Sequence, residues 1–383
     1  MQSFAPHHEE HATLDTAGKL PFNETICTPE RAGPVRREEP AMKILEEALG
    51  RPFTDPDPDH ARMFFAGKTR RKIPKLIDLK SAVARHVHDG DYLVIGGFGA
   101  VRAPMAAVHE IVRQGRKHLG FAGHTSTHDI QVLTVGECYD RVDAAYVVGL
   151  EARGLSKAAR RRFESGEVEV VEDSNHGLAL RFRAAAMGVP FIPMRNTAGT
   201  DTFRYGNGKI VEDPYTGKPV VIKPALYGDV AFIHVHEADI YGNARFRGIE
   251  VSDRDVANSA KRVIITTERL VPHEEITRAP ELVKIPYYLV DAVCEVPHGA
   301  YPGLMPYEYF SDEAHLKEWL RVENNPDEYR SFVEEYVYGC ADHDEYVAKC
   351  GGLQRIMELR RVELNIDEEL RGEATGHPEG SRI

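Results

Sequence analysis

Short apolar segments alternate with helical segments along most of the chain, beginning at Ile73. The apolar segments are rich in β-branched and aromatic residues, and the segments that follow them have helical spacing of apolar residues. Clear examples are YLVIGG followed by PMAAVHEIVRQG, and then LGFAG, AAYVVG, VEVVED, VAFIHVHEA and KRVIITTERL. Parallel strands need a crossover connection, which is usually a helix. The alternation therefore predicts an α/β fold with an open, mostly parallel sheet and helices on both faces.

The two ends of the chain do not follow this pattern. Residues 1–72 are rich in Pro, Glu, Arg and His, and only MKILEEAL, at positions 42–49, has a helical apolar rhythm. We expect 1–72 to be an N-terminal arm and 73–323 to be the α/β domain. Amphipathic stretches such as LQRIMELRRVE predict a helical C-terminal extension at 324–371, followed by a disordered tail at 372–383.

Charge and cysteine content narrow the class of protein. The net charge is −12, which disfavours nucleic acid as a partner, so the basic string KTRRK at 68–72 is interpreted as a solvated boundary. No apolar run is long enough to span a membrane. The five cysteines lack CxxC spacing, and the N-terminal string MQSFAPHHEEH lacks a signal-peptide pattern. We therefore expect a cytoplasmic protein with free thiols and no membrane partner.

A glycine turn follows the expected strand at 92–95. Gly96, Gly97 and Gly99 lie between this strand and a helix whose first turn contains Pro104. Glycine permits positive φ and close approach of a ligand, and backbone N–H groups at such a turn can bind an anion or an oxyanion. GGFGAV does not match a dinucleotide fingerprint, because Arg102 stands where the third glycine would be, and no GK[ST] follows. A plain strand-to-helix turn remains the alternative.

Polar residues follow the next two apolar segments. The loop GHTSTHD places His124, Thr125 and Ser126 at the carboxyl end of a strand, where α/β sheets bind ligands. Its hydroxyls could bind a substrate carboxylate, or they could cap a helix that begins near Asp129. Metal binding by its histidines is disfavoured, because no carboxylate lies at a known spacing. Glu151 could act as a base or nucleophile, or form an ion pair with a nearby arginine.

Six motifs in order resemble the α-subunit of family I coenzyme A transferases, of the glutaconate CoA-transferase type. They are GGFGAVRAPMAAV, GHTSTHD, VGLEARGLS, FRAAAMGVPFIPMRNTAGTD, IHVHEADIYGNARFRG and VDAVCEVPHGAYPG, and they lie within 73–323. The resemblance implies a homologous β-subunit, in a heterotetramer or heterooctamer, with the active site between the subunits. The nucleophile in that family is a glutamate, usually in a SENG motif of the β half. This chain has no SENG, and its nearest string, Glu164-Ser165-Gly166, is expected to be a helix C-cap.

The resemblance also implies the chemistry. Acyl-CoA and a carboxylic acid would be the substrates, with a glutamyl-CoA intermediate on the partner and no permanently bound cofactor or metal. The N–H groups of Gly97 and Gly99 would stabilise the oxyanion. The acyl group would be bound by Gly96, Phe98, Arg102, His124, Thr125 and Ser126. Two alternatives stay open: a ring-opening hydrolase of cyclic acyl-CoA, with water activated by Glu151 or a nearby group, and a non-catalytic assembly subunit.

Overall fold

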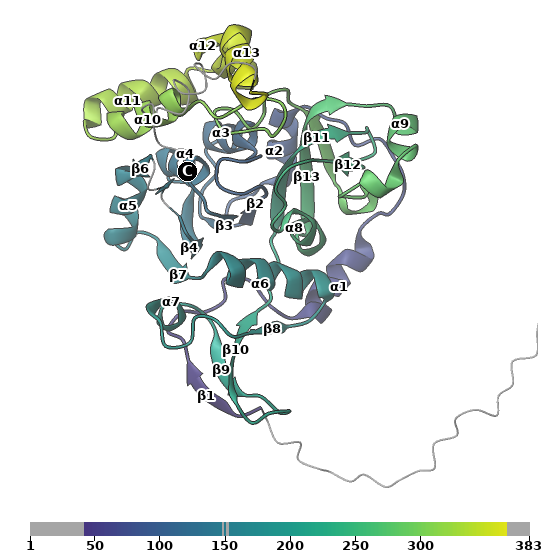
Figure 1. The fold of residues 1–383 in the computed structure, drawn as a ribbon, viewed down its shortest axis with the longest axis vertical. Coiled ribbons are helices and arrows are strands. Elements are labelled where there is room, and N and C mark those ends of the chain that lie inside the picture. Colours follow the sequence, from purple (N-terminus) through teal and green to yellow (C-terminus); the bar gives the residue numbers. More distant parts are fainter. Residues whose placement is uncertain (1–41, 148, 151–152, 366–383) are drawn as a thin grey trace, which may run out of the picture. The chain divides into compact units, whose positions relative to one another are not determined.

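A large parallel sheet forms the centre of the molecule (Figure 1). The computed structural model describes residues 42–147, 149–150 and 153–365, so the expected tail at 372–383 lies outside the described residues. The strand order is β14-β13-β11-β2-β3-β4-β7, all parallel, and the short strand β12 pairs with β11 in the antiparallel direction. The prediction of an α/β fold with a mostly parallel sheet is confirmed. The strands are β2 (Tyr92–Ile95), β3 (Leu119–His124), β4 (Tyr139–Ala145), β7 (Glu169–Glu172), β11 (Val230–Ala238), β12 (Ala244–Arg245), β13 (Arg262–Leu270) and β14 (Ala292–Glu295).

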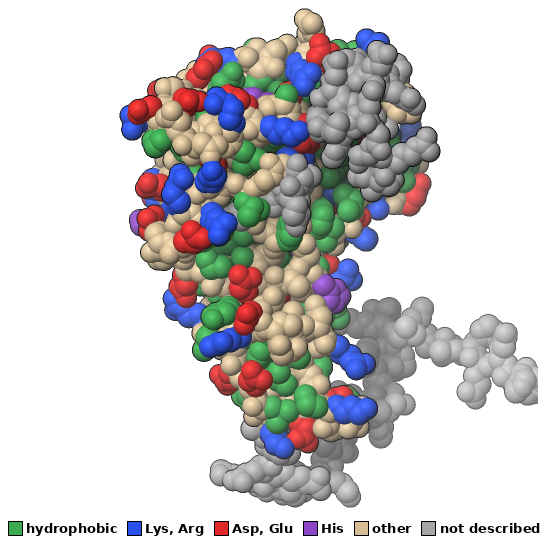
Figure 2. Space-filling model, turned by 60° about the vertical axis from the view of Figure 1, so that its left-hand side comes forward, with side chains coloured by type: hydrophobic (Ala, Val, Ile, Leu, Met, Phe, Trp, Pro, Cys, Tyr) green, Lys and Arg blue, Asp and Glu red, His purple; other side chains and the backbone are tan. Residues whose placement is uncertain are grey.

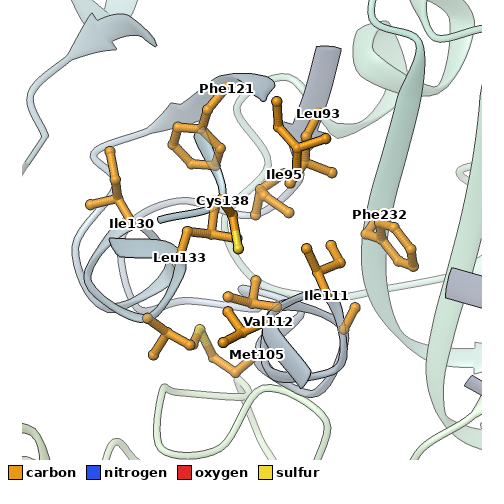
Figure 3. Packing of buried hydrophobic residues seen from close by; sticks show 14 of the residues in the cluster. Leu93, Ile95, Met105, Ile111, Val112, Phe121, Ile130, Leu133, Cys138 and Phe232 are labelled. Carbon is orange, nitrogen blue, oxygen red and sulfur yellow. The ribbon is translucent and has the colours of Figure 1, made fainter. Parts of the chain in front are cut away.

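Side chains alternate between the two faces of this sheet, and helices cover both. On β2, Leu93 and Ile95 point to one face and Tyr92 and Val94 to the other. The first face is covered by α2 (Leu79–His86), α3 (Met105–Arg113) and α4 (His128–Val135), and the second by α6 (Asn175–Met187) and α8 (Asp253–Ser259). Figure 3 shows side chains of α3 and α4 packed against the strands of the first face. Burying each large apolar side chain stabilises the fold by about 1.5–3 kcal/mol.

A second, antiparallel sheet has the order β1-β9-β10-β8. The helix expected from MKILEEAL is wrong, because these residues contain the strand β1. All four β1 residues are exposed, so no apolar face holds a helix there, whereas the backbone pairs with β9. An ion pair of 3.1 Å between Glu47 and Lys209 supports this pairing. The strands are β1 (Ile44–Glu47), β8 (Phe191–Met194), β9 (Lys209–Glu212) and β10 (Pro219–Pro224), and the helix α1 (Pro58–Gly67) also lies in the described part of 1–72.

The C-terminal helices pack through aromatic and histidine rings on α3 and α4, the helices that cover the first face of the large sheet. The buried Trp319 ring lies 5.1 Å from the His128 ring of α4, and Tyr346 lies 4.5 Å from His109 of α3. This packing joins the C-terminal helices to the α/β core. The helices are α10 (Glu313–Val322), α11 (Pro326–Val333), a π-helical turn (Glu334–Tyr338), α12 (His343–Lys349) and α13 (Gly352–Glu363).

The remaining short elements are β5 (Gly149–Leu150), β6 (Gly154–Leu155), α5 (Lys157–Glu164), α7 (Asp201–Arg204), α9 (His273–Thr277) and two 3₁₀ turns, Pro280–Leu282 and Tyr287–Leu289. Within the described ranges, no helix has both the length and the apolar character that crossing a bilayer requires. On the face shown in Figure 2, acidic and basic side chains are interspersed.

Candidate functional site

The glycine turn leaves the large sheet between β2 and β11. From β2 the chain builds β3, β4 and β7 on one side, and β11, β13 and β14 on the other, so the direction of the winding reverses here. Ile95 pairs with Phe232, and the Gly96 N–H donates to the Phe232 carbonyl at 2.9 Å before the chain turns away. Open α/β sheets bind ligands at such a reversal, beside the carboxyl ends of the strands.

Close contacts or a positive φ favour glycine at each of the three positions of the turn. A β-carbon at Gly96 would lie 3.0 Å from Ile233 Cγ1 and 3.1 Å from Asp253 Oδ1, so these close contacts favour glycine there. Gly97 and Gly99 have φ of +85° and +59°, in the region that side chains disfavour. The turn therefore favours glycine at all three positions.

The backbone N–H groups of the turn are mostly occupied. Gly97 donates to Asp253 Oδ1 at 3.0 Å, and Gly99 donates to the His124 carbonyl at 2.9 Å. The prediction that these two N–H groups are open to an oxyanion is therefore wrong, because both already have acceptors. The Phe98 N–H donates to the Val101 carbonyl at 3.0 Å. The N–H of the partly exposed Ala100 has no acceptor among the described residues.

Arg102 ends the turn and is fully buried. Its two terminal nitrogens lie 2.9 and 3.1 Å from the two carboxylate oxygens of Asp253, and Nη2 donates to the Ile249 carbonyl at 2.6 Å. The guanidinium also lies 4.2 Å from the centre of the Phe246 ring. A substrate cannot touch Arg102 without opening this ion pair, so the direct binding role expected for it does not fit this position.

His124 ends β3 next to the turn. Its Nε2 lies 2.9 Å from Ser252 Oγ, and the centre of its ring lies 6.4 Å from that of Phe98 and 6.0 Å from that of Phe182. Burial lowers the pKa of His124 to about 4, so the ring is neutral at neutral pH. Its Nδ1 is buried and has no hydrogen-bond partner in the described part of the chain.

The hydroxyl-rich loop caps α4 through its aspartate and not through its hydroxyls. Asp129 Oδ1 accepts the Thr127 N–H at 2.8 Å, whereas Thr127 makes no side-chain cap. Thr125 Oγ1 accepts from Asn175 Nδ2 at 3.0 Å, and Thr125 has φ of +50°. The hydroxyls of Ser126 and Thr127 are buried without a partner in the described ranges. A buried polar group without a partner lowers the stability of the fold by about 1–3 kcal/mol, which indicates that these hydroxyls have a role other than stabilising the fold.

The family model described as "Coenzyme A transferase" matches residues 76–296, more than half of the chain. The chain belongs to the coenzyme A transferase family. It is 32% identical over 305 residues to a glutaconate CoA-transferase subunit from Acidaminococcus fermentans, covering 75% of this chain and 95% of that protein. The crystal structure of that transferase superposes with a TM-score of 0.70 over 74% of this chain and 95% of the other.

Two further relatives of this transferase chain are named for other activities. A structure of a variant of the decarboxylase AibA/AibB is 32% identical, with a TM-score of 0.62 over 69% of this chain and 98% of the other. The cholesterol ring-cleaving hydrolase IpdA subunit of Rhodococcus jostii is 28% identical and covers 73% of this chain and 97% of that protein. The scaffold is therefore similar to proteins of more than one reaction class.

The transferase fold brings most of the expected site residues together, but not all. Gly96, Gly97, Phe98, Gly99, His124 and Thr125 lie at the carboxyl ends of β2 and β3, joined by the bonds and ring contacts above. Glu151 lies outside the described residues. Gly166, with φ of +76°, follows the end of α5, so the Glu164-Ser165-Gly166 string is a helix end as expected. No group of three possible metal ligands occurs in the described ranges.

Sequence reasoning missed Ser252 and Asp253. In the sequence, SDRD indicates a helix N-terminus, and α8 does begin there. That local pattern gives no sign that the two side chains contact the turn and His124, more than 120 residues away in the chain.

Proposed function

We propose that this chain is the α-subunit of a heteromeric CoA transferase, which moves CoA between an acyl-CoA and a carboxylic acid. The proposal places the nucleophilic glutamate on a homologous β-subunit. The relatives support it, because they are named as single subunits of CoA transferases. The carboxylates of Asp253, which contacts the turn, and of Asp129, beside the loop after β3, also support it, because both are buried and hydrogen-bonded. Neither is open to attack a thioester.

The reaction has two matched steps. The partner's carboxylate attacks the thioester carbonyl and expels CoA thiolate, which leaves a mixed anhydride. The thiolate then attacks the glutamyl carbonyl of the anhydride, expels the substrate carboxylate and forms the glutamyl-CoA thioester. A second carboxylic acid takes CoA by the reverse sequence. Each attack places negative charge on a carbonyl oxygen, which a fixed N–H donor stabilises.

One observation on this chain carries the proposal. The Ala100 N–H, the Nδ1 of His124 and the hydroxyl of Thr127, which have no partner among the described residues, belong to two neighbouring loops at the reversal point of the sheet. We assign oxyanion stabilisation to the Ala100 N–H and acyl-group contact to Phe98 and His124. The reaction as proposed needs no resident cofactor.

Purification with and without a co-expressed β-subunit tests the proposal. We expect CoA transfer from an acyl-CoA to a free carboxylate only in the complex, because the nucleophile is on the partner. Robust transfer by this chain alone would contradict the proposal. Transfer conserves the thioester, whereas a ring-opening hydrolase consumes water and yields no new acyl-CoA from an added acid, so the same assay separates the hydrolase alternative. A non-catalytic assembly subunit would tolerate changes in the turn.

A further inference from the structure

The first turn of α8 contacts both loops of the proposed acyl site. Ser252 precedes the helix and its Oγ lies 2.9 Å from Nε2 of His124, at the end of β3. The next residue, Asp253, accepts the Gly97 N–H at 3.0 Å in the turn after β2. Two consecutive residues of one helix end therefore hold two loops that come from different strands.

The Ser252 side chain does not perform the usual task of a serine before a helix. A serine before a helix usually accepts an N–H of the first helical turn, as Ser156 does for α5 (3.2 Å) and Ser174 does for α6 (2.9 Å). Within the described part of the chain, Ser252 makes no such bond, and α8 begins without a side-chain cap. The stabilisation that a cap would give to α8 is replaced by contacts to the site.

The Asp253 carboxylate holds the glycine turn at both of its ends. Oδ1 accepts from Gly97 at the start of the turn, and both oxygens accept from Arg102 at its end. Arg102 has φ of +57°, a conformation that is disfavoured for a long side chain and persists only where the surroundings fix it. Neither side chain of the pair has exposed surface, so water does not weaken the bidentate contact.

We propose that Asp253 and Ser252 are positioning residues: Asp253 fixes the glycine turn so that the Ala100 N–H points at the acyl oxygen, and Ser252 fixes the His124 ring. This inference rests on the proposed function. The consequence is a site whose donors are oriented before substrate arrives, without rearrangement during the reaction.

The double variant R102M/D253L tests the role of Asp253. Leucine has the heavy-atom branching of aspartate, and removing both charges avoids leaving a buried arginine without a partner. In the full chain, we expect the amides of 97–101 to exchange with deuterium about tenfold faster, because the turn loses its acceptor, with no change in β2 and β11. In the reconstituted complex, kcat should fall about 10²–10³-fold with little change in KM. A folded variant with wild-type exchange at 97–101, or with wild-type kcat in the complex, would overturn the proposal.

Asp255→Asn is the matched control on the same helix. Asp255 pairs at 2.7 Å with Arg183, whose side chain is 55% exposed, and it does not contact the turn. Its variant should leave exchange at 97–101 and kcat unchanged.

Ser252→Ala provides a second test that does not depend on the charge pair. It removes a hydroxyl that contacts the buried His124, so we expect a lower melting temperature, because Nε2 loses its partner, and about tenfold lower kcat at a temperature where the variant is fully folded. If R102M/D253L does not fold and S252A has wild-type kcat, the proposal is wrong. Hydrogen exchange is measured without turnover, so it tests the positioning role even if the wild-type complex does not transfer CoA. A wild-type complex that fails to transfer CoA would contradict only the proposed function.

Discussion

A β-carbon at Gly97 would lie 2.5 Å from the carbonyl oxygen of Val101, closer than these atoms approach in proteins. The Val101 carbonyl accepts the Phe98 N–H, so it cannot move without opening the turn. Gly99 differs, because a β-carbon there would lie 3.7 Å from the Thr125 carbonyl oxygen, an ordinary contact. There is therefore space for a β-carbon at Gly99 but not at Gly97, although both residues have positive φ.

We expect Gly97→Ala to destabilise the chain much more than Gly99→Ala. The left-handed conformation costs about 1–2 kcal/mol for alanine at either position. At Gly97 the clash with Val101 adds about 1–3 kcal/mol. Urea unfolding of both variants measures the difference, and equal losses of stability would contradict the geometry of the turn.

Removing the hydroxyl of Thr127, which has no partner among the described residues, should lower activity without lowering stability. Thr127→Val has nearly the same shape and removes a buried group without a partner in the described ranges, so we expect unchanged or increased stability, by up to about 1 kcal/mol. If the hydroxyl contacts substrate, kcat/KM of the complex should fall. The control is Thr134→Val in α4, the helix that Thr127 precedes. Thr134 Oγ1 bonds the Ile130 carbonyl and the Tyr139 hydroxyl at 2.7 Å, so the loss of this hydroxyl should destabilise the chain by about 1–2 kcal/mol. Wild-type kcat/KM in T127V would exclude a substrate contact.

The oxyanion role of Ala100 predicts a large effect of proline there. Ala100→Pro removes the N–H that has no acceptor in the described structure, and the loss of one such donor lowers kcat about 10²–10³-fold. Ala100→Ser keeps the N–H and serves as the control, with kcat near wild type. The comparison applies to variants whose melting temperatures match. An A100P complex with wild-type kcat would show that this N–H does not contact the reacting oxygen.

Buried histidines should make the fold sensitive to mild acid. His343 Nε2 donates to the His298 carbonyl at 2.8 Å, and burial lowers its pKa to about 4, below the unfolded value of about 6.5. The unfolded state then binds more protons as pH falls below about 6.5, so the free energy of unfolding decreases, by about 2 kcal/mol at pH 5 for one such group. Burial also lowers the pKa of His128 to about 3 and that of His315 to about 4, so these two residues also make the free energy of unfolding decrease as pH falls.

His343→Gln isolates one of these groups, because the glutamine amide can donate to the His298 carbonyl and does not titrate. Urea unfolding at pH 7 and pH 5 should show a decrease in stability that is about 2 kcal/mol smaller than in the wild type. The same decrease in both proteins would mean that His343 is protonated in the native state at pH 5.

The sequence was sufficient to predict the architecture, because periodicity and order determine it. The alternation of strands and helices predicted the sheet, and the position of Gly96, Gly97 and Gly99 after β2 predicted a turn at its carboxyl edge. The strand β1 was not predictable, because its residues have helical spacing and only the pairing with β9 makes them a strand. Local propensity is weak where a tertiary partner supplies the hydrogen bonds.

The candidate site was predictable as a location but not in its bonding. Nothing in GGFGAVR shows that the Gly97 N–H and the Arg102 guanidinium share one carboxylate, because Asp253 lies about 150 residues later in the chain. The sequence therefore indicated free N–H groups at Gly97 and Gly99, and the fold leaves Ala100 as the available donor among the described residues of the turn.

The most direct test of the central claim is mass spectrometry of the reconstituted complex after incubation with acyl-CoA, with and without borohydride. Borohydride reduces a glutamyl thioester to an alcohol and so marks the residue that carried CoA. We predict a CoA adduct, and the reduced residue after borohydride, on a glutamate of the β-subunit, not on this chain. An adduct on this chain, or none on either subunit during turnover, would contradict the account.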